Sequence, residues 1–135
     1  MAVQLSTTVR NAKLNAIETA IGASAVLKIR TGAQPANCAA ADSGTVLATL
    51  NLPADYFSDA AAGVKALLGT WEDTSADAAG TAAHWRLYAS DGTTCHGQGT
   101  VTATGGGGDL TLDNTSIAAG QKVTITSFAF TEANS

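Results

Sequence analysis

Two cysteines and two histidines are the residues of this chain best suited to bind a transition metal. They are Cys38, His84, Cys95 and His96. A structural zinc site needs four such ligands around one ion. Cys95 and His96 are adjacent in a stretch that reads as a β-strand, so their side chains should point to opposite faces. We therefore expect no metal and no cofactor, with His84 at the surface or at a subunit contact and His96 satisfied beside the apolar face.

Three carboxylates gather in the polar segment 72–80, where calcium is the ion to consider. They are Glu72, Asp73 and Asp77. Calcium binds oxygen ligands supplied by acidic loops. Acidic side chains in a polar loop are, however, more often simply hydrated. We expect solvated carboxylates in this segment.

Catalytic motifs are missing from the sequence. Serine, histidine and aspartate are present, but no serine lies in a G-x-S-x-G nucleophile motif. The glycine run 105–108 lacks the Lys-Ser/Thr pair of a phosphate-binding loop and precedes a predicted strand, so we interpret it as a flexible connection. No nucleophile, paired acids or metal ligands converge. We expect a protein that is not an enzyme.

Length and charge limit the class of protein further. The 135 residues suffice for one domain. A net charge of −4 with only seven lysines and arginines provides no basic cluster for phosphates, so we expect no nucleic-acid partner. No apolar run approaches the roughly 18 residues that cross a bilayer, and the first residues lack the features of a signal peptide. We expect no membrane partner and synthesis in the cytosol.

One segment, residues 6–21, has the periodicity of a helix. Ser6 is a suitable N-cap, and Gly22 stands where a helix would end. The apolar side chains of one stripe belong to Val9, Leu14, Ile17 and Ile21. A helix of this length is marginal alone in water, so the stripe needs a partner. We predict an N-terminal arm and amphipathic helix over residues 1–22 that serves as an assembly device.

The stretch 81–104 reads as a β-hairpin, because Asp91-Gly92 is a strong turn signal between two extended segments. Trp85 and Leu87 alternate with more polar residues on the incoming strand. We predict that Trp85 and Leu87 face the core. We expect a structural role for this hairpin, since nothing on it resembles a reaction centre.

An uninterrupted ladder would fix the register of this hairpin. Counting outward from the turn, Leu87 would then pair with His96 and Arg86 with Gly97. Gly97 and Gly99 would leave space on the face where Arg86 lies. We take this register as the expectation.

The remaining chain shows short apolar alternations separated by turn signals. This spacing is typical of antiparallel all-β domains. We predict a mainly β fold: an antiparallel β-sandwich or jelly-roll-like domain over residues 23–135, preceded by the one N-terminal helix.

Four stretches together resemble a family of small virion proteins of tailed bacteriophages and prophages. They are LSTTVRNAKLNAIETAIG, LKIRTGAQPANC, SADAAGTAAHWRLYASDGTTCHGQGTV and DLTLDNTSIAAGQKVTITSFAFTEAN, which cover nearly the whole chain. The resemblance implies a non-enzymatic structural protein, first of all a head decoration (cement) protein. A tail- or fibre-associated protein is the alternative within this family. No catalytic residues come with it.

The resemblance also implies partners and a location. The chain would form a homo-oligomer, with a trimer as one candidate, and bind the major capsid protein or another virion protein. It would be made in the cytoplasm of the host bacterium and end in the virion. A different class remains open as an alternative: a host-surface glycan-binding module with exposed Trp71, Tyr56 or Tyr88 as stacking platforms.

The state of the two thiols is open from the residues alone. Cys38 and Cys95 could pair, or stay reduced as is usual in the cytosol. The resemblance implies a finished particle outside the cell, which favours the bridge. A bridge would hold the loop 32–44 on the hairpin. We predict that Cys38 and Cys95 lie close together and are joined in mature particles.

Overall fold

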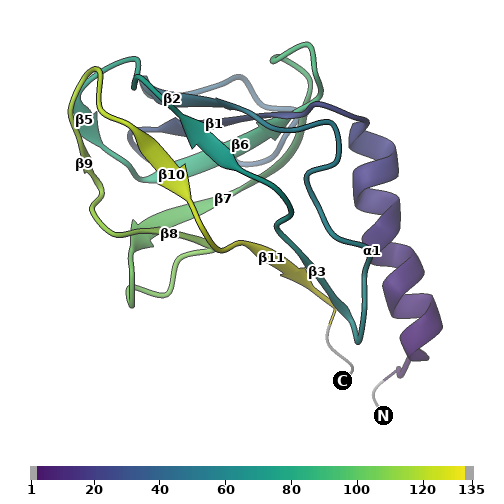
Figure 1. Ribbon diagram of the computed structural model, residues 1–135. Coiled ribbons are helices and arrows are strands. Elements are labelled where there is room, and N and C mark those ends of the chain that lie inside the picture. Colours follow the sequence, from purple (N-terminus) through teal and green to yellow (C-terminus); the bar gives the residue numbers. More distant parts are fainter. Residues whose placement is uncertain (1–2, 133–135) are drawn as a thin grey trace.

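The computed structural model describes residues 3–132, which form one N-terminal helix followed by short strands (Figure 1). The helix is α1 (Thr7–Ile21). The strands are β1 (Val26–Arg30), β2 (Val46–Asn51), β3 (Val64–Ala66), β4 (Trp71–Asp73), β5 (Gly80–Thr81), β6 (His84–Tyr88), β7 (Cys95–Ala103), β8 (Leu110–Leu112), β9 (Ser116–Ile117), β10 (Val123–Ile125) and β11 (Ala129–Thr131). The prediction of a mainly β chain with one N-terminal helix is confirmed.

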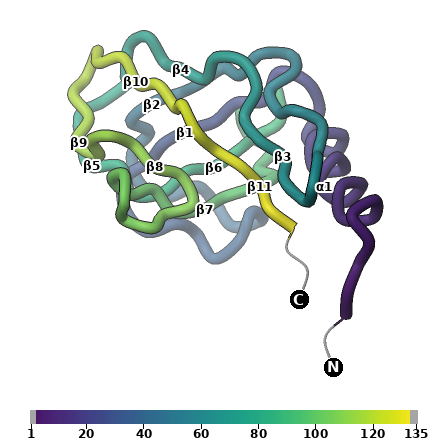
Figure 2. The backbone as a smooth tube through the Cα atoms, turned by 60° about the horizontal axis from the view of Figure 1, so that its bottom comes forward, coloured from purple at the N-terminus to yellow at the C-terminus, as the bar shows by residue number. Residues whose placement is uncertain are grey.

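The largest sheet has five strands in the order β2-β1-β6-β7-β8 and curls into a half-barrel (Figure 2). Its first four strands are antiparallel, whereas β8 runs parallel to β7. Parallel neighbours usually need a crossover of a dozen or more residues. Here the glycine-rich connection 104–109 suffices, because Gly105 and Gly107 take positive φ angles of 88° and 81°. Within this connection the Gly108 N–H donates to Thr102 Oγ1 at 3.0 Å.

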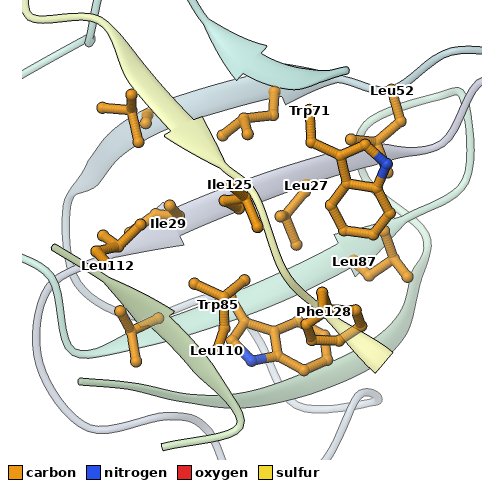
Figure 3. Packing of buried hydrophobic residues seen from close by; sticks show 14 of the residues in the cluster. Leu27, Ile29, Leu52, Trp71, Trp85, Leu87, Leu110, Leu112, Ile125 and Phe128 are labelled. Carbon is orange, nitrogen blue, oxygen red and sulfur yellow. The ribbon is translucent and has the colours of Figure 1, made fainter. Parts of the chain in front are cut away.

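Three two-stranded antiparallel ribbons accompany this sheet, with the pairings β10-β4, β11-β3 and β5-β9. The core lies between the sheet and the ribbons (Figure 3). The sheet supplies Leu27 and Ile29, and the ribbon side supplies Trp71, Ile125 and Phe128. Burial of these side chains drives the two parts together.

Local signals define both ends of α1. The Ser6 hydroxyl accepts the Val9 N–H at 3.2 Å, and Gly22, with φ 88°, donates its N–H to the Glu18 carbonyl at 2.9 Å. The bounds predicted from the sequence are therefore confirmed.

The apolar stripe of α1 is not left free for a partner. Leu14 and Ile21 are only 2% and 6% exposed, and Ile17 packs against the core of the same chain. Val9, with 44% exposure, is the member of the stripe that faces solvent.

Polar contacts tie α1 to β3 and to the segment before it as well. The Asn15 side chain accepts the Ala60 N–H at 2.9 Å, and the buried Lys65 ammonium reaches Glu18 at 2.9 Å. The helix is therefore an integral part of the monomer, because the chain itself covers most of the surface assigned to assembly.

The hairpin keeps its predicted turn but shifts its register. The Ala89 N–H donates to Thr94, and Tyr88 pairs with Cys95 as expected. The ladder then slips, so that Leu87 pairs with Gly97 and Arg86 with Gln98. His96 is the extra residue, and a bulge of this kind turns every following side chain to the other face.

The expected position of the two glycines is therefore wrong. Gly97 and Gly99 lie on the face of Trp85, not on that of Arg86. A Cβ at Gly99 would lie 2.8 Å from the indole and 2.6 Å from Asp109, whereas one at Gly97 would lie 3.6 Å from the indole. Trp85 and Leu87 are buried in the core, 3% and 1% exposed.

This register makes a prediction about the two glycines. Gly99→Ala should lower the free energy of unfolding by about 1–3 kcal/mol, because the methyl group overpacks Trp85. Gly97→Ala is the matched control and should change stability by less than about 0.5 kcal/mol. Urea unfolding of both variants measures this. Equal effects would contradict the shifted ladder.

Candidate functional site

A slot lies between β7 and β11, and it brings together residues that are far apart in the sequence. Its volume is about 420 Å³. The helix contributes Ile17 and Ile21, and β6 contributes Trp85 and Leu87. We call this cavity the β7–β11 slot. Four residues that the sequence assigned separately to an assembly helix and to a hairpin core therefore form one apolar wall.

Aromatic packing positions the floor of the slot. Phe128, in the segment between β10 and β11, packs edge-on against Trp85 with ring centroids 5.3 Å apart at 89° (Figure 3). Phe130 packs edge-on against Phe128 at 5.1 Å and 84°. These contacts fix the course of β11 relative to the sheet, since aromatic pairs of this geometry are favourable beyond their burial.

The rim of the slot is polar. His96 is exposed at the bulge, and Asp109 lies at the end of the slot where β8 begins. The Asp109 carboxylate accepts both the N–H and the hydroxyl of Thr100, at 3.0 and 3.2 Å. Among the described residues that line the slot, Asp109 is the one carboxylate, and there is no lysine or arginine.

The opposite face of β6 carries a buried cluster of charged groups beneath the loop 32–44. Arg86, 1% exposed, donates to the carbonyls of Asn37, Cys38 and Ala40 at 3.0–3.2 Å and pairs with Asp42. Asp42 also pairs with Arg30 at 3.0 Å. The alternation in β6 therefore does not separate a core face from a solvent face, because the loop covers the second face.

The pKa values of this cluster follow from its surroundings. Burial acts to raise the pKa of Asp42, but hydrogen bonds from Tyr88 and Arg86 and the charge of Arg30 bring it below its usual value. Burial, and then its bond to Asp42, raises the pKa of Tyr88 to about 12. The cluster therefore keeps one carboxylate ionised between two guanidinium groups, which is the paired state that buried charges require.

His84 belongs to this cluster and is fully buried, which corrects the expectation of a surface histidine. Its Nδ1 lies 2.8 Å from the Gly32 carbonyl oxygen, so Nδ1 carries the proton that is donated. Burial lowers the pKa of His84, which favours the neutral ring. The other correction concerns His96, which is exposed rather than packed beside Leu87.

Both thiols lie at the edge of this cluster and are free. Burial first, and then a hydrogen bond with Cys38, raises the pKa of Cys95 to about 11. Arg86 holds the Cys38 carbonyl at 3.0 Å, and Gln98 holds that of Pro35 at 2.7 Å, so the loop is anchored over β7. The two thiols lie close, and the bridge between them stays a prediction.

The carboxylates of the segment 72–80 are exposed or half-buried, as expected, and each also has a partner within the chain. Asp73 accepts the Thr49 N–H at 2.9 Å, and Asp77 accepts the Thr49 hydroxyl at 2.7 Å. Glu72 pairs with Lys122 at 3.0 Å. These groups cover the outer edge of β2. Within residues 3–132, no group of three or more His, Cys, Asp and Glu side chains is arranged to hold a metal ion.

The stacking platforms named for glycan binding are not available. Trp71, Tyr56 and Tyr88 are at most 1% exposed. Trp71 donates its indole N–H to the Tyr56 and Leu68 carbonyls, each at 3.2 Å. Rings in this position cannot stack on a sugar in solvent.

The slot itself was missed by the sequence analysis. Each wall residue reads as an ordinary core residue, and the slot exists only because β11 returns beside α1 and β7. The phase change between Ile125 and Phe128 was the available signal that this strand changes its course.

Comparisons with known proteins give no neighbour: no family model, no curated protein and no solved structure matches the chain. In the described part of the chain, no helix is long and apolar enough to cross a membrane.

The thiol pair supports a redox prediction. Oxidised glutathione should join Cys38 to Cys95 by thiol–disulfide exchange, with loss of two hydrogen atoms from the chain, and raise stability by roughly 4 kcal/mol. Intact mass and urea unfolding measure both effects, with Cys38→Ser as the control that cannot close. Two thiols that stay free and are alkylated without denaturant would count against the bridge.

Proposed function

We propose that this chain is a non-enzymatic assembly protein that holds another polypeptide in the β7–β11 slot. The observation that supports this most is the slot itself: an apolar wall of Ile17, Ile21, Trp85 and Leu87 beside two strands. Apolar cavities with a few polar rim groups are the usual form of binding sites. The buried charges of the opposite face are paired within the chain and give no second site of this kind.

The virion is the setting that we propose for this assembly. The support is the sequence resemblance to small virion proteins of tailed phages, which covers nearly the whole chain. Within that setting we propose a head decoration protein that oligomerises and reinforces the shell, with the major capsid protein as its neighbour. A tail-associated position is the alternative within the same proposal.

We describe the fold in this proposal as an incomplete sandwich. The curled five-stranded sheet is one layer, and the ribbons β10-β4 and β11-β3 are the other. The slot lies where β7 of one layer and β11 of the other are not paired with each other. An assembly partner that fills the slot would complete the sandwich.

Particle binding tests the proposal. Purified particles that carry the protein should contain hundreds of copies if it decorates the head, and far fewer if it belongs to the tail. Ile17→Lys should reduce binding to stripped particles at least about tenfold, because a charge in an apolar site is costly. Val9→Lys is the matched control on the same helix outside the slot, and it should bind normally.

Quantitative mass spectrometry and sedimentation with particles measure these outcomes. Both variants must first show a melting temperature close to that of the unmodified chain. Loss of binding in Val9→Lys with normal binding in Ile17→Lys would place the assembly face on the exposed side of α1 and overturn the slot. Absence of the protein from particles would overturn the virion setting.

A further inference from the structure

The backbone of β7 has an open edge along the slot. In an antiparallel pair, alternate residues direct their N–H and C=O groups toward the partner strand and away from it. The Val101 N–H donates to Ala83 at 2.9 Å on the β6 side, and the Thr100 N–H points the other way, to Asp109. Two residues further back, Gln98 therefore directs its backbone N–H and C=O away from β6. β8 pairs only with Val101 to Ala103, so it does not cover Gln98.

The backbone of β11 has a second open edge along the same slot. The Leu67 N–H donates to Phe128 at 2.8 Å, and the Glu132 N–H donates to Gly63 at 2.9 Å. These bonds fix the alternation of the β11–β3 pair. Ala129 and Thr131 therefore direct their backbone groups away from β3. No other strand of residues 3–132 pairs with that side of β11.

The two edges border one cavity. Gln98 from β7 and Ala129 and Thr131 from β11 all line the β7–β11 slot. Figures 1 and 2 both show β11 with β3 on one side and β7 on the other. We propose that the slot binds an extended segment of a partner polypeptide, which adds as a β-strand between β7 and β11. This inference rests on the proposed function and names the chemistry of the partner.

The hydrogen-bonding groups of the slot select an extended strand as its occupant. A strand carries unpaired N–H and C=O groups on both sides, so it can bond to both edges at once. A helix has its own backbone groups paired, and an apolar small molecule would leave both edges without partners. Alternate residues of a strand point to one face, so the partner strand needs apolar side chains at alternate positions to pack against the apolar wall.

The charge of the slot limits which partner strands can bind. Asp109 is the carboxylate of the lining, and the part of the lining that the structure describes contains no lysine or arginine. The whole chain carries a net charge of −4. An acidic segment would be repelled, so the strand that fits is neutral in its apolar part and carries lysine or arginine at its ends.

A synthetic peptide is a direct probe of this mode. The peptide Lys-Val-Thr-Val-Thr-Val-Lys, with blocked ends and a fluorophore, is titrated with the full chain. Its control is the same sequence with N-methyl groups on alternate residues, which keeps the side chains and removes the N–H donors of one edge. We expect the native peptide to bind, and the methylated peptide to bind roughly tenfold to hundredfold more weakly.

A pair of protein variants tests the β11 edge. Ala129→Pro removes one outward N–H and leaves the β11–β3 bonds in place, so peptide affinity should fall roughly fivefold to tenfold. Ala129→Val also enlarges the side chain but keeps this N–H, so it is the reference variant: Ala129→Pro should bind the peptide more weakly than Ala129→Val. The melting temperature of each variant checks that β11 is intact.

Three results would overturn the proposal that a partner polypeptide adds a strand in the slot. Equal affinity for the native and methylated peptides would mean that only side chains are recognised. No binding at millimolar peptide would mean that the slot does not accept a strand. Self-association of the full chain that Ala129→Pro abolishes would make a second copy the occupant. In the first two cases, the proposed function would still hold if Ile17→Lys loses particle binding. The peptide experiments therefore test strand addition, and particle binding tests the proposed function separately.

Discussion

One extra residue in β7 sets the geometry on which the rest of the molecule depends. His96 bulges from the ladder, so Gly97 and Gly99 oppose Leu87 and Trp85. The space at Gly99 admits the indole, and Phe128 then packs edge-on against it. The same shift decides which backbone groups of β7 point away from β6. The packing of the core and the open edge of the slot therefore have a common cause.

The charged cluster behind β6 supports the same geometry from the other side. Arg86 is buried and donates hydrogen bonds to three carbonyls of the loop 32–44. Asp42 forms ion pairs with both Arg86 and Arg30. Removing one member of such a group leaves an uncompensated buried charge, which is why these contacts hold the loop firmly. The hairpin is covered on one face by the loop and on the other by the core. Its edge is the part that remains available for a partner.

The sequence predicted the elements that depend on local chemistry. The cap at Ser6, the end of the helix at Gly22 and the Asp91-Gly92 turn are each determined by a few neighbouring residues, and each is found in the structure. The core position of Trp85 followed from alternation, because this pattern is preserved when the register slips on the other strand.

The features that the sequence could not predict depend on contacts between distant segments. The bulge at His96 is favoured by packing of Trp85 against the glycines, which no local pattern shows. The loop 32–44 covers the polar face of β6 because Asp42 meets Arg86, and apolar alternation carries no information about such a pair. The stripe of α1 by itself predicts an assembly face, because the segments that cover it, β3 and β11, are distant from it in the sequence. The slot needs both the bulge at His96 and the return of β11 beside α1, since its lining comes from these segments.

Residue-resolved amide hydrogen exchange of the free full chain, followed by NMR, tests the central claim most directly. We predict that the amides of Gln98, Ala129 and Thr131 exchange at rates close to those of an unfolded peptide. The neighbouring amides of Gly99 and Phe130, which point toward β6 and β3, should be strongly protected. Equal protection of both groups would show that the two edges are already paired, and would contradict a slot that is open to a partner strand.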